Sequence, residues 1–207
     1  MIQRKISVPC LFYGANITGN IVEFDIDVHE AARGSALIGS RLESRIVDEE
    51  LVQMLYACYR HFMETERYYS SAMSLEINSK NFSYLQRNKI FIEGASFSFG
   101  LLAGMYLLGY GRTWPEGVYT SAEISFTHMD KRVKGPKITP VGAVSHKAKY
   151  VFEKAGGSIL YMPYDNVRSL LRSRKWRGRN LGVLPIPLSE ALSFFCTNSK
   201  ERDNEID

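Results

Sequence analysis

Hydrophobic residues alternate with polar ones in several short segments, which is the pattern of β-strands with one buried face. In residues 21–28, four apolar positions alternate with three acidic ones: Val22, Phe24, Ile26 and Val28 against Glu23, Asp25 and Asp27. Residues 73–77 alternate in the same way, and residues 118–126, 158–162 and 181–186 also read as strands. We therefore expect strands spread along the whole chain.

A second pattern repeats apolar residues every three or four positions, as a helix with one buried stripe does. Asp48 is expected to cap a long helix, with Glu49 and Glu50 in the first turn, where the helix dipole favours anions. The predicted buried stripe consists of Leu51, Leu55, either Cys58 or Tyr59, and Phe62.

An uncharged segment of 18 residues, Gly94 to Gly111, predicts a central helix over about residues 96–110. Eighteen residues is also the length at which a membrane-spanning helix becomes a candidate. The segment holds five glycines and two serines, and Arg112 follows it directly. This mixture favours a helix buried in a protein core, and we expect no membrane segment.

Short helices and strands alternate in the second half of the chain. A helix over residues 145–155 should end at Gly156-Gly157, which suits a left-handed cap. Another helix should start at Asn166, and Ser189 should cap the last one. Residues 129–140 carry four cations and indicate an exposed insertion.

Length and composition fit one globular domain. The chain has 207 residues, of which 45% are hydrophobic and 23% charged, and this excludes disordered and fibrous classes. Residues 197–207 are polar and indicate a disordered tail, so we expect a single α/β domain over residues 1–196. The net charge of +4 is too small to indicate a nucleic acid or a membrane surface by itself.

Residue spacing argues against metals and nucleotide cofactors, and we expect none. The three cysteines are far apart and form no CxxC pair, and the four histidines are never three or four positions apart. Neither GxxxxGK[ST] nor GxGxxG occurs. The unpaired cysteines, and an N-terminal stretch unlike a secretory signal, favour a cytoplasmic protein.

Two residues are candidates for chemistry. Ser96 lies where an extended run meets the central helix, and the backbone N–H groups at a helix start can receive a developing oxyanion. Lys147 lies in the first turn of a predicted helix, where its positive charge is mildly disfavoured. Each has an ordinary explanation as well, because serine is a common helix cap and most lysines are simply solvated.

The sequence around these residues resembles the proteolytic domain of Lon proteases. Three stretches stand where the family has the motifs Gly-Pro-Ser-Ala-Gly, Thr-Gly-Glu-Ile and Pro-Val/Ile-Gly-Gly, although not every residue is identical: Gly94-Ala95-Ser96, Ser121-Ala122-Glu123-Ile124 and Pro140-Val141-Gly142-Ala143. Lys147 then falls on the family's catalytic lysine. The agreement continues through Tyr161-Met162-Pro163, Asp165-Asn166 and residues 188–192, and it covers roughly residues 19–195.

The resemblance implies a Ser-Lys peptidase on an α/β (α+β) fold of the ribosomal protein S5 domain 2-like type, with mixed sheets and packed helices. Ser96 would be the nucleophile, Lys147 the general base and Ser121 the hydroxyl that orients the lysine. Glu93, directly before the motif, is a candidate gate whose carboxylate would keep the lysine charged. A free lysine has a pKa of about 10.4, so burial must bring it to roughly 7–8 before it can serve as a base.

Several positions depart from the family pattern and leave alternatives open. Phe97 directly follows the nucleophile and could narrow the substrate groove. Ser98 is a second hydroxyl, although two positions along a helix it faces elsewhere. Lys149 is an alternative base, although counting from Gly142 favours the lysine at 147. His146 projects about 100° away from that lysine around the helix and is not expected to join the site.

The resemblance also implies partners. The substrate would be a protein or peptide, cut as a serine endopeptidase does. Lon couples this domain to an ATPase that this chain lacks, so an ATPase or another activator is expected to act in trans. Family members assemble as hexameric rings, and we expect a homo-oligomer, with a hexamer favoured.

Two other functions compete with this one. A non-proteolytic scaffold of the RadA or ComM type would form rings and bind nucleic acid through residues 168–179, where six cations surround Trp176. A self-processing peptidase, like the related birnavirus proteases, would cut within the polar tail after Thr197.

Overall fold

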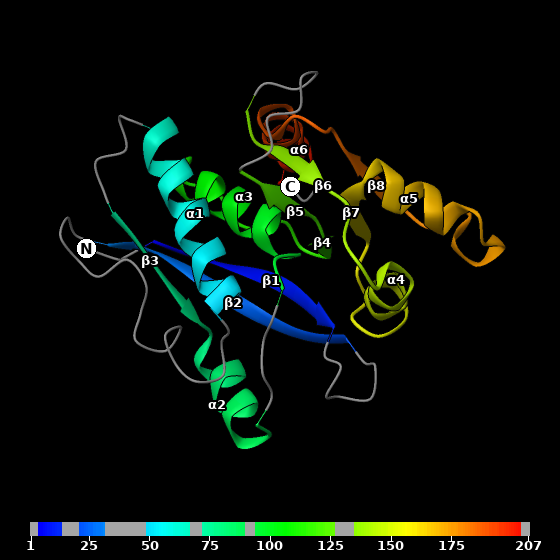
Figure 1. Ribbon diagram of the computed structural model, residues 1–207, viewed down its shortest axis with the longest axis horizontal. Coiled ribbons are helices and arrows are strands. Elements are labelled where there is room, and N and C mark those ends of the chain that lie inside the picture. Colours follow the sequence, from blue (N-terminus) through cyan, green and yellow to red (C-terminus); the bar gives the residue numbers. More distant parts are fainter. Residues whose placement is uncertain are drawn as a thin grey trace.

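The computed structural model describes residues 4–13, 21–31, 49–66, 72–89, 94–126 and 135–203. Within these residues, three sheets and six α-helices form the mixed α/β fold expected from the sequence. Helices α1 (Glu49–Thr65) and α2 (Ser79–Arg87) lie at one side of the molecule in Figure 1. Helices α4 (Val144–Glu153) and α5 (Tyr164–Leu171) lie at the other side, with α3 (Ser98–Gly109) between the two groups.

The first sheet is antiparallel, and its strands pair in the order β1-β2-β3. Its strands are β1 (Lys5–Tyr13), β2 (Ile21–Ala31) and β3 (Ala72–Ile77). The strands predicted at residues 21–28 and 73–77 are therefore confirmed, and β2 continues three residues beyond the alternating segment. Ile26 and Leu75 are fully buried, as the alternation requires of the apolar face.

Helix α3 lies on this sheet and is buried on all sides. Two of its glycines allow the close approach, because they lie four positions apart on one face. A Cβ atom at Gly104 would clash with Val8 of this sheet, and one at Gly100 would clash with Thr120, which lies outside it, and would lie 3.6 Å from Val8 Cγ1. The uncharged segment is thus a core helix, as predicted. Among the described helices, none has the length and apolarity that crossing a bilayer requires.

Helix α1 packs against α3 through its predicted stripe. Leu51, Leu55, Cys58 and Phe62 are buried, whereas Tyr59 is only partly buried, so Cys58 holds the position that the sequence left open. The expected cap, Asp48, lies outside the described residues.

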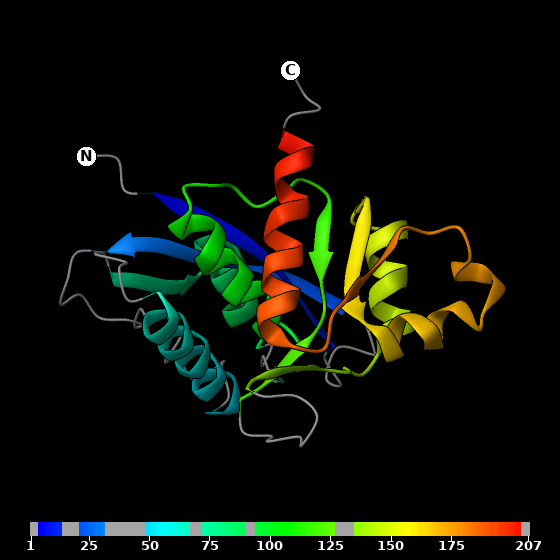
Figure 2. The same cartoon turned by 90° about the horizontal axis from the view of Figure 1, so that it is seen from above.

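The remaining strands form a parallel sheet in the order β4-β7-β8 and a two-stranded antiparallel sheet, β5-β6. Their bounds are β4 (Val118–Thr120), β5 (Glu123–Ser125), β6 (Lys137–Thr139), β7 (Ile159–Pro163) and β8 (Leu181–Leu184). The last helix, α6 (Leu188–Asp203), packs against α3, β6 and β8 and stands near the centre of Figure 2.

The single strand expected over residues 118–126 is two strands. The break comes at Ser121 and Ala122, which belong to neither strand. Ser121 N–H donates to the carbonyl of Tyr161 in β7, and Ala122 N–H donates to the carbonyl of Ser96. The chain therefore leaves one sheet and meets the turn that holds Ser96 before it joins the other sheet.

Several boundaries differ from the sequence prediction, and most, such as α4 ending at Glu153 and β8 at Leu184, differ by one or two residues. Four differences change the interpretation. Part of the insertion expected at residues 129–140 is strand β6, and residues 129–134 lie outside the described residues. Helix α5 starts at Tyr164, before Asn166, because Pro163 is suited to the position that precedes a helix. Ser189 lies in the first turn of α6 and does not cap it. The same helix runs through Asp203, so disorder over residues 197–203 was a wrong prediction.

Candidate active site

Ser96 and Lys147 come from different parts of the chain and meet in the structure. Lys147 Nζ lies 2.8 Å from Ser96 Oγ and 2.9 Å from Ser121 Oγ, within hydrogen-bond distance of both. Lys147 thus contacts both serines that the resemblance assigns to the site, Ser96 and Ser121. Ser96 Oγ also lies 3.4 Å from the carbonyl oxygen of Leu11 in β1, which can accept its proton in a hydrogen bond.

Ser96 lies in a turn that precedes α3. The helix starts two residues later, at Ser98, and Phe97 precedes its first residue. The turn begins at Gly94, whose φ of +90° is a conformation that favours glycine. It is closed by a hydrogen bond from Ser98 N–H to the carbonyl of Ala95. Ser96 is therefore not a helix cap, and its side chain is free to face Lys147.

Lys147 is presented by the first turn of α4. Ala143 precedes the helix with φ of +54°, and its carbonyl accepts hydrogen bonds from the N–H groups of His146 and Lys147. The loop before Ala143 is fixed by Asn166, which is buried. Its side chain accepts from Val141 N–H at 2.9 Å and donates to the carbonyl of Val141 at 3.0 Å.

The sequence analysis assigned no role in the site to Asn166, which was the expected start of a helix and part of the stretch that agrees with the Lon family. A buried asparagine that bonds both backbone groups of one residue acts like a short piece of strand. The only sequence signal was an asparagine close to an apolar run, and that signal is common in turns.

Burial changes the proton affinity of Lys147. The residue is 2% exposed, and this burial lowers the pKa of Lys147 from 10.5 to about 8. Loss of hydration disfavours the charged form, and hydroxyl groups compensate less than a carboxylate would. The lowered pKa brings the neutral amine, the form that accepts a proton, into the range near neutral pH.

The alternatives that the sequence left open are separated by burial. Ser98 is fully buried, and its hydroxyl accepts a hydrogen bond from Ile124 N–H at 2.8 Å. Lys149 is exposed on the far side of α4 from the buried Lys147. Phe97 is 1% exposed and packs against Phe12, so it does not line the site. These positions favour the Ser96–Lys147 pair.

His146 is exposed and its ring lies 5.4 Å from that of Tyr13, at the rim of the site. It makes no contact with the dyad in the structure described. Glu93, the candidate gate, lies outside the described residues.

A cleft of about 540 Å³ opens at the dyad. It is lined by the turn that holds Ser96, by the loop before α4, by the first turn of α4 and by side chains of β1, α1 and β5. The lining residues are Tyr13, Glu50, Gly94, Ala95, Ser96, Glu123, Pro140, Val141, Gly142, Ala143, His146 and Lys147. The lining therefore combines the two motif regions that the resemblance relies on. A chain segment lying in this cleft would meet Ser96 Oγ.

A second hydrogen-bond cluster fixes the helix that carries Lys147. The carboxylate of Glu23, on β2, accepts hydrogen bonds from the hydroxyl of Tyr119, on β4, at 3.2 and 3.3 Å. It also accepts one from Tyr150, which lies on α4. Burial raises the pKa of Glu23, and burial together with the Glu23 charge raises the pKa of Tyr150 to about 12. The cluster connects α4 to the first sheet and to the parallel sheet.

The basic segment at residues 168–179 has no exposed aromatic ring on Trp176, which stacking on a nucleic-acid base would require. Trp176 is 4% exposed, in the short 3-10 helix Arg174–Trp176, so its ring is not available to stack on a base. Lys175 forms an ion pair with Glu153 at 2.7 Å, and its ammonium lies 4.7 Å from the Trp176 ring centre. The competing scaffold function therefore gains no stacking surface from Trp176 in this structure.

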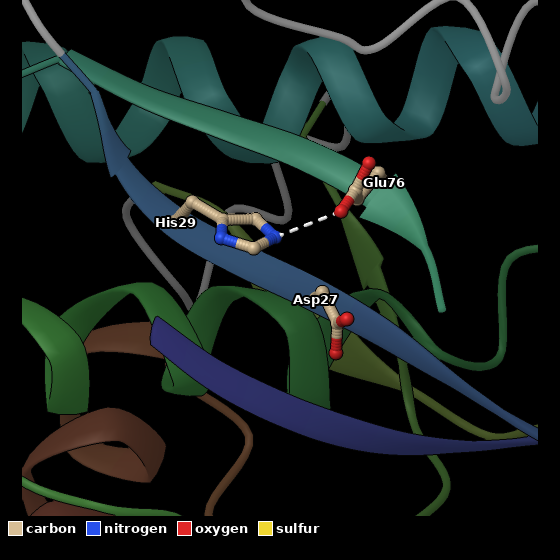
Figure 3. A group of neighbouring side chains, drawn as sticks. All are labelled: Asp27, His29 and Glu76. Atoms are coloured by element: carbon tan, nitrogen blue, oxygen red, sulfur yellow. Dashed lines mark hydrogen bonds and ion pairs between the residues drawn. The ribbon is translucent and has the colours of Figure 1, made fainter. Parts of the chain in front are cut away.

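Asp27, His29 and Glu76 lie together on the first sheet (Figure 3). They come from neighbouring strands in register, a grouping that a search for helical histidine spacing misses. His29 Nε2 lies 3.1 Å from Glu76 Oε1. Asp27 already accepts hydrogen bonds from Lys5, Ser7 and Asn78, so a metal ion here would have to displace these internal contacts.

Comparison with models of known protein families gives no match for this chain, and comparison with curated proteins gives none either.

Proposed function

We propose that the protein is a serine peptidase with a Ser–Lys dyad, similar to the Lon proteolytic domain, in which Ser96 is the nucleophile and Lys147 the general base. The observation that carries the proposal is the buried lysine whose Nζ contacts two serine hydroxyls, one of them in an open cleft. A lysine that only stabilised the fold would gain more from a carboxylate partner, because buried ammonium groups are costly without one.

In the protonated state, Lys147 Nζ donates to both hydroxyls and Ser96 O–H can donate to the Leu11 carbonyl. After Nζ loses its proton to solvent, it can accept the Ser96 proton. Ser96 Oγ then attacks the carbonyl carbon of the scissile peptide bond, and the carbonyl oxygen becomes an oxyanion. Ser121 keeps Nζ in place by accepting the hydrogen bond of an N–H that takes no part in the transfer.

The tetrahedral intermediate then collapses. The ammonium of Lys147 gives its proton to the leaving amine, the C–N bond breaks and an ester on Ser96 remains. Water attacks that ester, passes its proton to Lys147 and releases the acid product, and the proton returns to Ser96. The backbone N–H of Ser96 is a candidate oxyanion donor, since among the described residues it has no hydrogen-bond acceptor.

Activity towards a mixed peptide library, read by mass spectrometry at pH 9, tests the proposal. The wild type should cut specific bonds, and both Ser96→Ala and Lys147→Met should lose at least 10³-fold in rate. Lys149→Met is the matched control, because it makes the same change at an exposed lysine of the same helix. No cleavage by the wild type, or unchanged cleavage in Lys147→Met, would overturn the proposal.

An activator or ATPase in trans, a hexameric assembly and a cytoplasmic setting remain predictions. Binding of nucleic acid through residues 168–179 would have to rely on exposed cations such as Arg168 and Arg172 rather than on stacking.

A further inference from the structure

Two carboxylates line the cleft that holds Ser96. Glu50 is exposed in the first turn of α1, and Glu123 is half-buried on β5. Glu123 follows Ala122, whose N–H donates a hydrogen bond to the carbonyl of Ser96 at 3.0 Å. The backbone that carries the Glu123 carboxylate is therefore held next to the turn that contains Ser96. Substrate bound at Ser96 would therefore pass these two side chains.

Neither carboxylate has a hydrogen-bond donor or a cation paired with it among the described residues. The charge of Glu50 acts on Glu123 instead. Burial and the charge of Glu50 both raise the pKa of Glu123, as expected for a carboxylate that has no cation beside it. The other titratable groups that line the cleft are Tyr13 and His146, at the rim, and Lys147, which is engaged by Ser96 and Ser121.

We propose that the cleft selects polypeptides with a lysine or arginine near the scissile bond, and that Glu50 and Glu123 receive that side chain. The proposal rests on the proposed peptidase function and adds the substrate class to it. A substrate cation would relieve the repulsion between the carboxylates and would supply the charge that this part of the cleft lacks.

A side-chain cation fits this pair better than a metal ion does. Within the described ranges, Glu50 and Glu123 have no third carboxylate, histidine or cysteine within ligand distance, whereas the metal-like grouping of this chain is the one on the first sheet. Two carboxylates match one ammonium or one planar guanidinium, each of which needs a few acceptors and no closed coordination shell.

Cleavage-site preference tests the proposal. The wild type is incubated with a peptide library in which Lys, Arg, Gln and Glu are balanced at every position, and cut sites are read by mass spectrometry. In the wild type we expect a preference of roughly tenfold for Lys or Arg over Gln near the cut. This preference should fall to roughly threefold in Glu50→Gln or Glu123→Gln and should be absent from the double variant. High salt should weaken the preference of the wild type, because exposed charges are screened.

Two further variants sharpen the result. Glu49→Gln removes the same charge from the same helical turn but from a side chain that does not line the cleft, so the preference should stay at its wild-type value. Glu50→Lys should shift the preference towards Asp and Glu. Circular dichroism melting of each variant separates altered preference from loss of fold.

The experiment distinguishes failure of the substrate assignment from failure of the peptidase proposal. Cleavage without a preference for basic residues, or an unchanged preference in the double variant, would overturn the substrate assignment and leave the peptidase proposal standing. Absence of any wild-type cleavage would overturn the peptidase proposal, and the substrate assignment with it.

Discussion

Replacing Lys147 by methionine should make the protein more stable at neutral pH. Lys147 is 2% exposed, and its pKa falls from 10.5 to about 8 because of burial. The folded chain therefore holds a proton at pH 7 in a place that disfavours it. Methionine has a similar length and no charge, so it fills the same space without the desolvation penalty.

The sign and size follow from proton linkage. Between pH 8 and pH 10.5 the unfolded chain binds the Lys147 proton more strongly than the folded chain, so wild-type stability rises with pH in that window. The expected rise from pH 7 to pH 10 is about 2–3 kcal/mol at about 1.4 kcal/mol per pH unit. Below pH 8 both states hold the proton, and the contribution of Lys147 is constant. The methionine variant lacks this dependence.

Urea unfolding at pH 6, 7, 8, 9 and 10 measures the effect. At pH 7 the free energy of unfolding of Lys147→Met should exceed that of the wild type by about 1–3 kcal/mol, a range that already subtracts the two hydrogen bonds lost with the lysine. The difference should become smaller or change sign by pH 10. Lys149→Met, at an exposed position, should follow the wild type throughout. A stability difference between Lys147→Met and wild type that is the same at pH 7 and pH 10 would refute the lowered pKa.

Three other predictions address the same site and its support. The rate constant for peptide cleavage should rise with pH and level off above a midpoint near 8, because Lys147 must be neutral to act, and a bell centred below pH 7 would contradict this. Ser121→Ala should lower kcat by about tenfold or more and move that midpoint downward, since it removes a hydroxyl that accepts from the charged form. Gly104→Ala should destabilise the fold by about 1–3 kcal/mol in urea unfolding, because its Cβ would strike Val8, whereas Gly142→Ala, with open space around it, should leave stability nearly unchanged.

Much of the fold could be read from periodicity. Two strands of the first sheet (β2 and β3), the buried stripe of α1 and the central helix appear where alternation or helical spacing predicts them. The break between β4 and β5 could not be read, because hydrophobicity does not change when a strand exchanges one hydrogen-bonding neighbour for another. The sequence prediction ended helix α6 too early for a related reason. The last turns of this helix are polar and show no apolar stripe that would mark them as helical.

The candidate site was predictable only through the resemblance. Neither Ser96 nor Lys147 carries a pattern of its own, and their approach to 2.8 Å depends on a helix and a turn far apart in sequence. The roles of Asn166 and Trp176 were not predictable either. Both depend on which side chains are buried by long-range packing, and a local pattern does not contain that information.

Reactivity of Ser96 towards an uncharged fluorophosphonate probe tests the central claim most directly, because it requires neither a known substrate nor an activator that recognises one. Intact-mass and peptide mass spectrometry should find one adduct, on Ser96, that forms faster as pH rises through about 8. The adduct should be absent from Lys147→Met and present in Lys149→Met. No adduct on Ser96 at pH 9, or equal labelling in Lys147→Met, would show that the lysine does not activate the serine.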